Sequence, residues 1–156
     1  MKLLTTCAAA ALMIAAAPAL AADRITVSLD ASDMQNLLLG LNGLDGYHRV
    51  IKNAQGQEQD VLVAYDIAAA GRVIIAHDEV AIQAAFADYR QAKSGVTDPA
   101  KVADILAVKR DLALETFDVG ALKLDANPIP ASVLAAIGFV CPTCVGQDAP
   151  PPPAKQ

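Results

Sequence analysis

Tryptophan is absent from this 156-residue chain, and aromatic side chains together make up only 4% of it. A core built from this composition is aliphatic. Positive charge is also scarce, with 12 lysines and arginines against 17 aspartates and glutamates, and the basic residues form no stripe. Binding to nucleic acid requires clustered basic residues for the phosphates and is often helped by repeated aromatic rings for the bases. Both shortages exclude nucleic acid from the expected partners.

Catalytic motifs are missing as well. Ser28, Ser32, Ser94 and Ser132 lie outside any G-x-S-x-G context, and Gly40–Gly43 lacks the lysine of a phosphate-binding loop. The sequence therefore predicts no catalytic residue and no cofactor, and it favours a non-enzymatic protein. A hydrolase stays open as an alternative, because residues distant in the sequence can meet in a pocket.

The N-terminal segment is the most distinctive part of what is present. Lys2 gives a positive start, Cys7–Ala17 is an almost unbroken apolar run, and Ala19–Ala21 offers a small-x-small cleavage pattern. These three parts are typical of a secretory signal peptide over residues 1–21. The apolar run is shorter than the roughly 20 residues of a spanning helix, so we expect no stable membrane insertion after cleavage. We expect a periplasmic or secreted protein that begins at Ala22.

A strand, a helix and a hairpin are predicted next. Arg24–Leu29 alternates polar and apolar residues, as a half-buried strand does. Asp30 or Ser32 can cap the helix that follows, and Gly43 or Gly46 can end it. After that helix, two β-leaning runs flank a polar stretch that contains a glycine, which predicts a β-hairpin. The two runs are Tyr47–Lys52 and Asp60–Asp66.

Two helices follow in the prediction. Ala68–Lys93 is rich in alanine and has no proline, which indicates a long helix. Asp98 and Pro99 form a helix start signal, and the second helix is expected to continue to about Glu115. The pair predicts an antiparallel helical hairpin. Phe117–Leu124 is then expected to return as a short strand.

The C-terminal part contains most of the prolines. Asp125–Pro130 cannot be regular structure, and Ser132 to about Phe139 is predicted as a short helix. The fold class is therefore α+β. We expect a signal peptide over 1–21, one domain over 22–140, and a cysteine-containing, disordered proline-rich tail over 141–156.

Cys141-Pro142-Thr143-Cys144 is the one constellation that suggests chemistry. This spacing can form a local disulfide, act as a redox pair, or supply half of a zinc site. An oxidising compartment favours the disulfide. The redox role depends on exposure of the pair, and the zinc site would need His48 and His77 or a second chain to complete four ligands.

His77-Asp78-Glu79 groups three titratable side chains on the long predicted helix. Successive helical residues point about 100° apart, so these side chains do not converge on one point. We interpret them as a solvated polar face.

Four segments together resemble a group of small, uncharacterised phage- or prophage-type proteins. They are Leu41–Tyr47, Tyr65-Asp66, Ala87–Arg90 and Asn127–Leu134. The resemblance implies the same α+β order of elements, and it brings no activity, cofactor or catalytic residue. We expect an exported, non-enzymatic interaction or accessory domain with an unknown protein partner in the cell envelope. The alternative is a thiol/disulfide or metal-binding module that uses Cys141 and Cys144.

Overall fold

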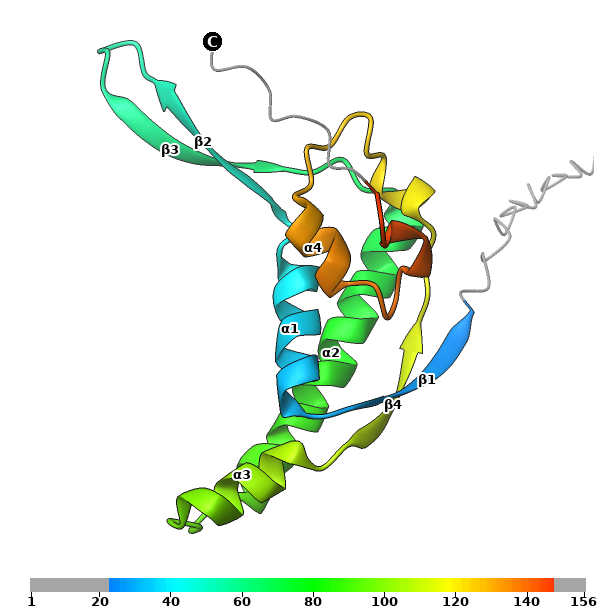
Figure 1. Cartoon of the computed structure of the whole chain (residues 1–156). Helices are drawn as coiled ribbons and strands as arrows, with labels where there is room; N and C mark the ends of the chain where they lie inside the picture. The colour runs from blue at the N-terminus through cyan, green and yellow to red at the C-terminus, as the bar shows by residue number, and fades with distance from the viewer. Residues whose placement is uncertain (1–22, 148–156) are drawn as a thin grey trace, which may run out of the picture.

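The computed structural model describes residues 23–147, so the expected signal peptide and the end of the proline-rich tail lie outside it. Within this range the chain is α+β, as predicted, with four α-helices and two antiparallel two-stranded sheets. The helices gather in the centre of the molecule. One sheet lies beside them, and the other projects away from the body (Figure 1).

The first two elements confirm the prediction. Strand β1 covers Arg24–Leu29, and helix α1 covers Ala31–Asn42. Asp30 is the N-cap, because its carboxylate accepts the backbone N–H of Ser32 at 2.8 Å. Such a bond satisfies one of the amides that have no partner inside the helix. Gly43 follows the last turn.

Helix α2, Ala69–Ala92, is the central element of the core. It packs against α1 and against strand β4, Arg110–Glu115. Its buried residues recur at spacings of three and four, which is the pattern of one helix face. They are Gly71, Ile75, Asp78, Ile82, Ala85 and Tyr89. Apart from Tyr65, the other large, fully buried side chains are aliphatic, as the composition predicts, and they include Met34, Leu37, Leu41, Leu114, Leu122, Ile129 and Leu134.

The prediction of a helix to Glu115 is wrong. Helix α3 covers only Pro99–Ala107, begins at the Asp98 cap as expected, and returns along the C-terminal end of α2. Strand β4, Arg110–Glu115, then pairs antiparallel with β1. A lone β1 would leave its backbone donors and acceptors unpaired, so this pairing outweighs the helical preference of the two leucines and the alanine in β4.

The predicted strand over Phe117–Leu124 is also wrong, because a 3-10 helix, η1, occupies Val119–Leu122. Asn127 fixes the irregular segment that follows. Its side chain accepts the backbone N–H of Asp66 at 2.9 Å and donates to the carbonyl of Leu122 at 2.6 Å. Helix α4, Ala131–Ala136, is three residues shorter at its end than predicted and packs on α1.

The hairpin is confirmed to within two residues, with β2 at Gly46–Lys52 and β3 at Glu58–Ala64. Asn53 closes its loop by accepting the backbone N–H groups of Gln55 and Gln57 on its side chain. Gly56 has φ of 76°, which a residue with a side chain rarely adopts. We call residues 46–64 the hairpin arm, which extends from the body beside α4 (Figure 1).

Candidate functional site

Cys141 and Cys144 form a disulfide with a Cα–Cα distance of 5.3 Å. Both cysteines are completely buried and belong to the hydrophobic core, whereas the sequence analysis places them in a tail beyond the domain. Cys144 is the last residue of the short 3-10 helix η2, Pro142–Cys144, and Cys141 directly precedes this helix. The disulfide therefore lies inside the folded unit rather than at an exposed end.

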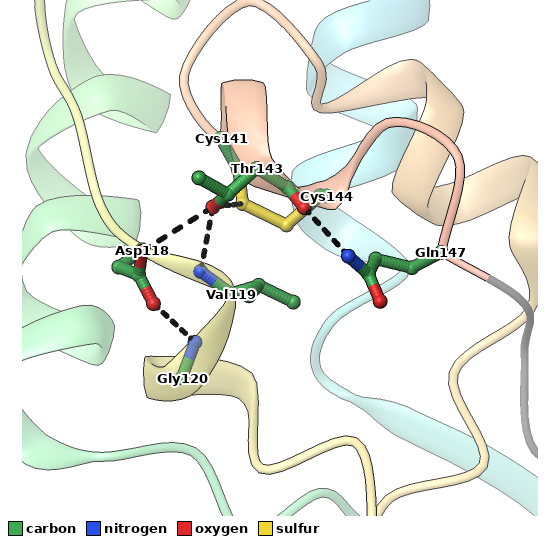
Figure 2. Close-up of a disulfide and its surroundings, with 7 residues drawn as sticks. All are labelled: Asp118, Val119, Gly120, Cys141, Thr143, Cys144 and Gln147. Atoms are coloured by element: carbon green, nitrogen blue, oxygen red, sulfur yellow. Dashed lines mark hydrogen bonds between the residues drawn. A yellow bond between two sulfur atoms is a disulfide. The ribbon is translucent and has the colours of Figure 1, made fainter.

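Thr143 joins this C-terminal turn to η1 (Figure 2). Its hydroxyl accepts the backbone N–H of Val119 at 3.0 Å and donates to a carboxylate oxygen of Asp118 at 3.5 Å. The other oxygen of Asp118 caps η1 by accepting the N–H of Gly120 at 2.7 Å. The surroundings of the disulfide thus hold two short helices together.

The burial of the disulfide and its surroundings bear on the two other roles considered for the cysteines, thiol exchange and zinc binding. Thiol exchange requires a sulfur atom that another thiolate can reach, and burial denies that approach. For zinc, the residues between 23 and 147 contain no group of three His, Cys, Asp or Glu side chains close enough to share a metal ion. Neither observation favours a thiol or metal module.

Asp78 corrects the interpretation of His77-Asp78-Glu79 as a solvated face. His77 is exposed, but Asp78 is 1% exposed on the core side of α2. One carboxylate oxygen of Asp78 accepts the backbone N–H of Glu115 at 2.9 Å, and the other has no hydrogen-bond partner. Burial raises the pKa of Asp78 to about 6, against a lowering by the backbone hydrogen bond. The three-four spacing of the buried stripe in α2 already pointed to this position.

Glu115 lies beside Asp78, and its carboxylate contacts the side chains of Arg24 and His77. Its carboxylate is 3.0 Å from the guanidinium of Arg24 and 3.6 Å from Nδ1 of His77. The hydrogen bond from Arg24 is the main reason that the pKa of Glu115 is lowered. The pKa of Asp78 is therefore raised while that of Glu115 is lowered. Opposite pKa shifts of two neighbouring carboxylates are also found in catalytic pairs.

Three cavities between residues 23 and 147 lie away from this carboxylate pair. A hollow of about 600 Å³ lies between α1, α2 and α3, and a groove of about 670 Å³ lies between α1 and α4. A third cavity, of about 110 Å³, places Glu79 near Asp45. None of these three is lined by Asp78 or Glu115. The carboxylate pair thus joins α2 to β4 and lies outside these three cavities.

The hairpin arm has two open backbone edges. Within the described residues, β2 and β3 pair only with each other. The N–H of Asn53 donates to the Gln57 carbonyl at 3.0 Å, and that of Tyr65 donates to the Asp45 carbonyl at 3.3 Å, so odd-numbered residues face across the hairpin. Even-numbered residues point their N–H and C=O groups outward. They are His48, Val50 and Lys52 on β2, and Glu58, Asp60 and Leu62 on β3.

Apolar side chains of the arm are exposed on both of its faces. Val50 is 62% exposed and Leu62 is 54% exposed on one face, and Ile51 is exposed on the other. Near the body, the ring of Tyr47 stacks on that of Tyr65 with centroids 5.6 Å apart. The arm is thus anchored at its base and uncovered along its length.

Comparison with known protein families, with curated proteins and with solved structures finds no match to this chain. Among the described residues, no helix combines the length and the apolar character needed to cross a membrane.

Proposed function

We propose that this protein is an exported, non-enzymatic interaction domain that binds a protein partner in the cell envelope through the hairpin arm. The observation that carries the proposal is the arm itself. Its two seven-residue strands have open edges and exposed apolar side chains. Peptide-binding proteins often use such edges, because an added strand satisfies the free backbone groups.

An isolated two-stranded hairpin is marginal in water, and three strands or a covering helix are usually needed for stability. Here Asn53 organises the loop and Tyr47 anchors the base, but none of the helices between residues 23 and 147 packs on the middle of the arm. A partner strand would supply the missing contacts.

Two features support export. The composition of residues 1–21 is that of a signal peptide, and the core contains a disulfide, which persists in oxidising compartments and is rare in the cytosol. Intact-mass measurement of the protein purified from cells tests this part. We expect a chain that begins at Ala22 and lacks the two thiol hydrogens of Cys141 and Cys144.

Photocrosslinking in intact cells tests the arm. A benzophenone amino acid is introduced at Val50 or Leu62, and at Val80 of α2 as a matched control, since Val80 is 67% exposed but lies on the body. We expect discrete protein adducts from the two arm positions and none from Val80. Equal adducts at all three positions, or none on the arm, would contradict the proposal.

A further inference from the structure

The two open edges of the hairpin arm differ in how they are protected against pairing with other strands. The edge of β2 carries His48, Arg49 and Lys52 and no acidic residue. Natural proteins commonly use charged side chains, especially lysine, to prevent an edge strand from pairing. The edge of β2 therefore has basic side chains, Arg49 and Lys52, on both sides of its apolar pair Val50-Ile51.

The edge of β3 lacks such protection at its body end. Residues 61–64 are Val61, Leu62, Val63 and Ala64, with no charge, proline or glycine among them. The two acidic residues of β3, Glu58 and Asp60, both lie in its first half. A strand of this kind, with its backbone groups free, is a ready template for pairing with another chain.

From this asymmetry we infer that the β3 edge pairs with the β3 edge of a second copy of the chain, in an antiparallel, two-fold symmetric dimer. The inference rests on the proposed function and specifies the occupant of one edge. Two-fold dimers are the commonest oligomers, and antiparallel pairing places the two helical bodies at opposite ends of the joined strands.

One register follows from the sequence of β3. The strand has seven residues, so only a two-fold axis at Val61 pairs its full length, Glu58–Ala64. In that register Asp60 lies opposite Leu62 of the second copy and Glu58 lies opposite Ala64 of the second copy. No like charges are directly opposed, whereas an axis at Asp60 would place the two Asp60 carboxylates face to face.

The outward hydrogen bonds fit the same register. Asp60 and Leu62 are even-numbered residues whose N–H and C=O groups point away from β2. Opposite each other across the new interface, they would form a hydrogen-bonded pair. Val61 and its copy would then form the closer, non-hydrogen-bonded pair, with Cα atoms about 4.5 Å apart.

Sedimentation velocity on the protein as purified from cells tests the dimer. We expect the mass to rise with concentration from that of one chain to that of two. Leu62→Glu on the β3 edge should weaken the association at least tenfold, because each new carboxylate would lie opposite Asp60 of the other copy. Ile51→Glu makes the same kind of change on β2, where the residue is also exposed and lies opposite the uncharged Gln59, and it should leave the association unchanged.

Disulfide trapping tests the register. Val61→Cys should give a covalent dimer on a non-reducing gel, because Cα atoms about 4.5 Å apart permit a disulfide. Gln59→Cys is the matched control on the same face of the strand. It should give no covalent dimer, since residue 59 lies opposite Val63 of the second copy and not opposite its own copy. In hydrogen exchange, the amides of Asp60 and Leu62 should gain protection on dimerisation while that of Val50 does not.

The inference is overturned if the protein stays monomeric at every concentration, if Leu62→Glu and Ile51→Glu act alike, or if Gln59→Cys crosslinks as well as Val61→Cys. These failures are separable from a failure of the proposed function. A monomer that still forms arm-specific adducts with another protein in cells retains the proposed function and loses only the dimer.

Discussion

Replacing Asp78 by asparagine should remove a pH-dependent cost from folding. Asp78 is 1% exposed, and one of its carboxylate oxygens has no hydrogen-bond partner, so ionisation in the folded state is unfavourable. Asparagine keeps the same shape and retains an oxygen that can accept the N–H of Glu115. It cannot ionise. The change therefore isolates the effect of the charge.

The magnitude follows from the two pKa values. The pKa of Asp78 rises from 3.8 to about 6 on folding, and at 1.36 kcal/mol per pKa unit this corresponds to about 3 kcal/mol. The folded state holds the proton more tightly than the unfolded state does. Stability from this group is therefore greatest below pH 3.8, decreases as the pH rises towards 6, and stays at its lower level above that.

The assay is urea unfolding followed by far-ultraviolet circular dichroism, since the chain has no tryptophan, from about pH 4, just above the lower of the two pKa values, to about pH 7.5. We expect the unfolding free energy of the wild type minus that of Asp78→Asn to decrease by about 2 kcal/mol over this range, which is most of the full difference. The ionisable groups that the two proteins share contribute to both unfolding free energies and largely cancel in the difference.

Asp104→Asn on the exposed surface of α3 provides the control, because it makes the same chemical change where solvent reaches the side chain. A difference curve for Asp78→Asn that is as flat as that of Asp104→Asn, or one that rises with pH, would refute the account of Asp78 as a buried, poorly solvated carboxylate.

Three further substitutions test how the body is held together, each by the midpoint and free energy of urea unfolding. Asn127→Ala should destabilise the protein by about 3 kcal/mol, because buried backbone groups lose their partners, whereas an unchanged value would mean that water replaces the side chain. Changing Cys141 and Cys144 together to alanine should cost about 2 kcal/mol, as expected for a loop this short; a loss well above that would point to a larger role in packing. Tyr89→Phe removes the hydroxyl that donates to the Val108 carbonyl and should cost about 1 kcal/mol, and no loss would show that this bond does not hold the junction between α3 and β4 to α2.

Local signals predicted the elements that local interactions determine. The Asp30 and Asp98 caps, the alternation of Arg24–Leu29 and the polar loop around Gly56 are each readable within a few residues, and the structure confirms them. The strand β4 is different, because its sequence of leucine, alanine and glutamate favours a helix. Only the need of β1 for a partner, some 80 residues away in the chain, makes it a strand.

The disposition of individual side chains was predictable only in part. Asp78 lies three residues after Ile75 and four before Ile82, in the buried stripe of α2. This helical spacing is enough to identify it as a core residue. The burial of Cys141 and Cys144 carried no such signal. It arises because Thr143 and Asp118, 25 residues apart, meet and draw the C-terminal turn onto η1.

The two described sheets differ in their contribution to the core. The β1–β4 pair belongs to the folded body, whereas the β2–β3 pair extends away from it. Leu29 of β1 and Leu114 of β4 are buried against the helices, so the body depends on that pair. The hairpin arm is held by its own contacts, through Asn53 at the loop and Tyr47 at the base. Val50 and Leu62 take no part in the core. Their apolar character is not explained by packing against any other residue between 23 and 147, which is why the arm, rather than the buried disulfide, is the surface on which function is best sought.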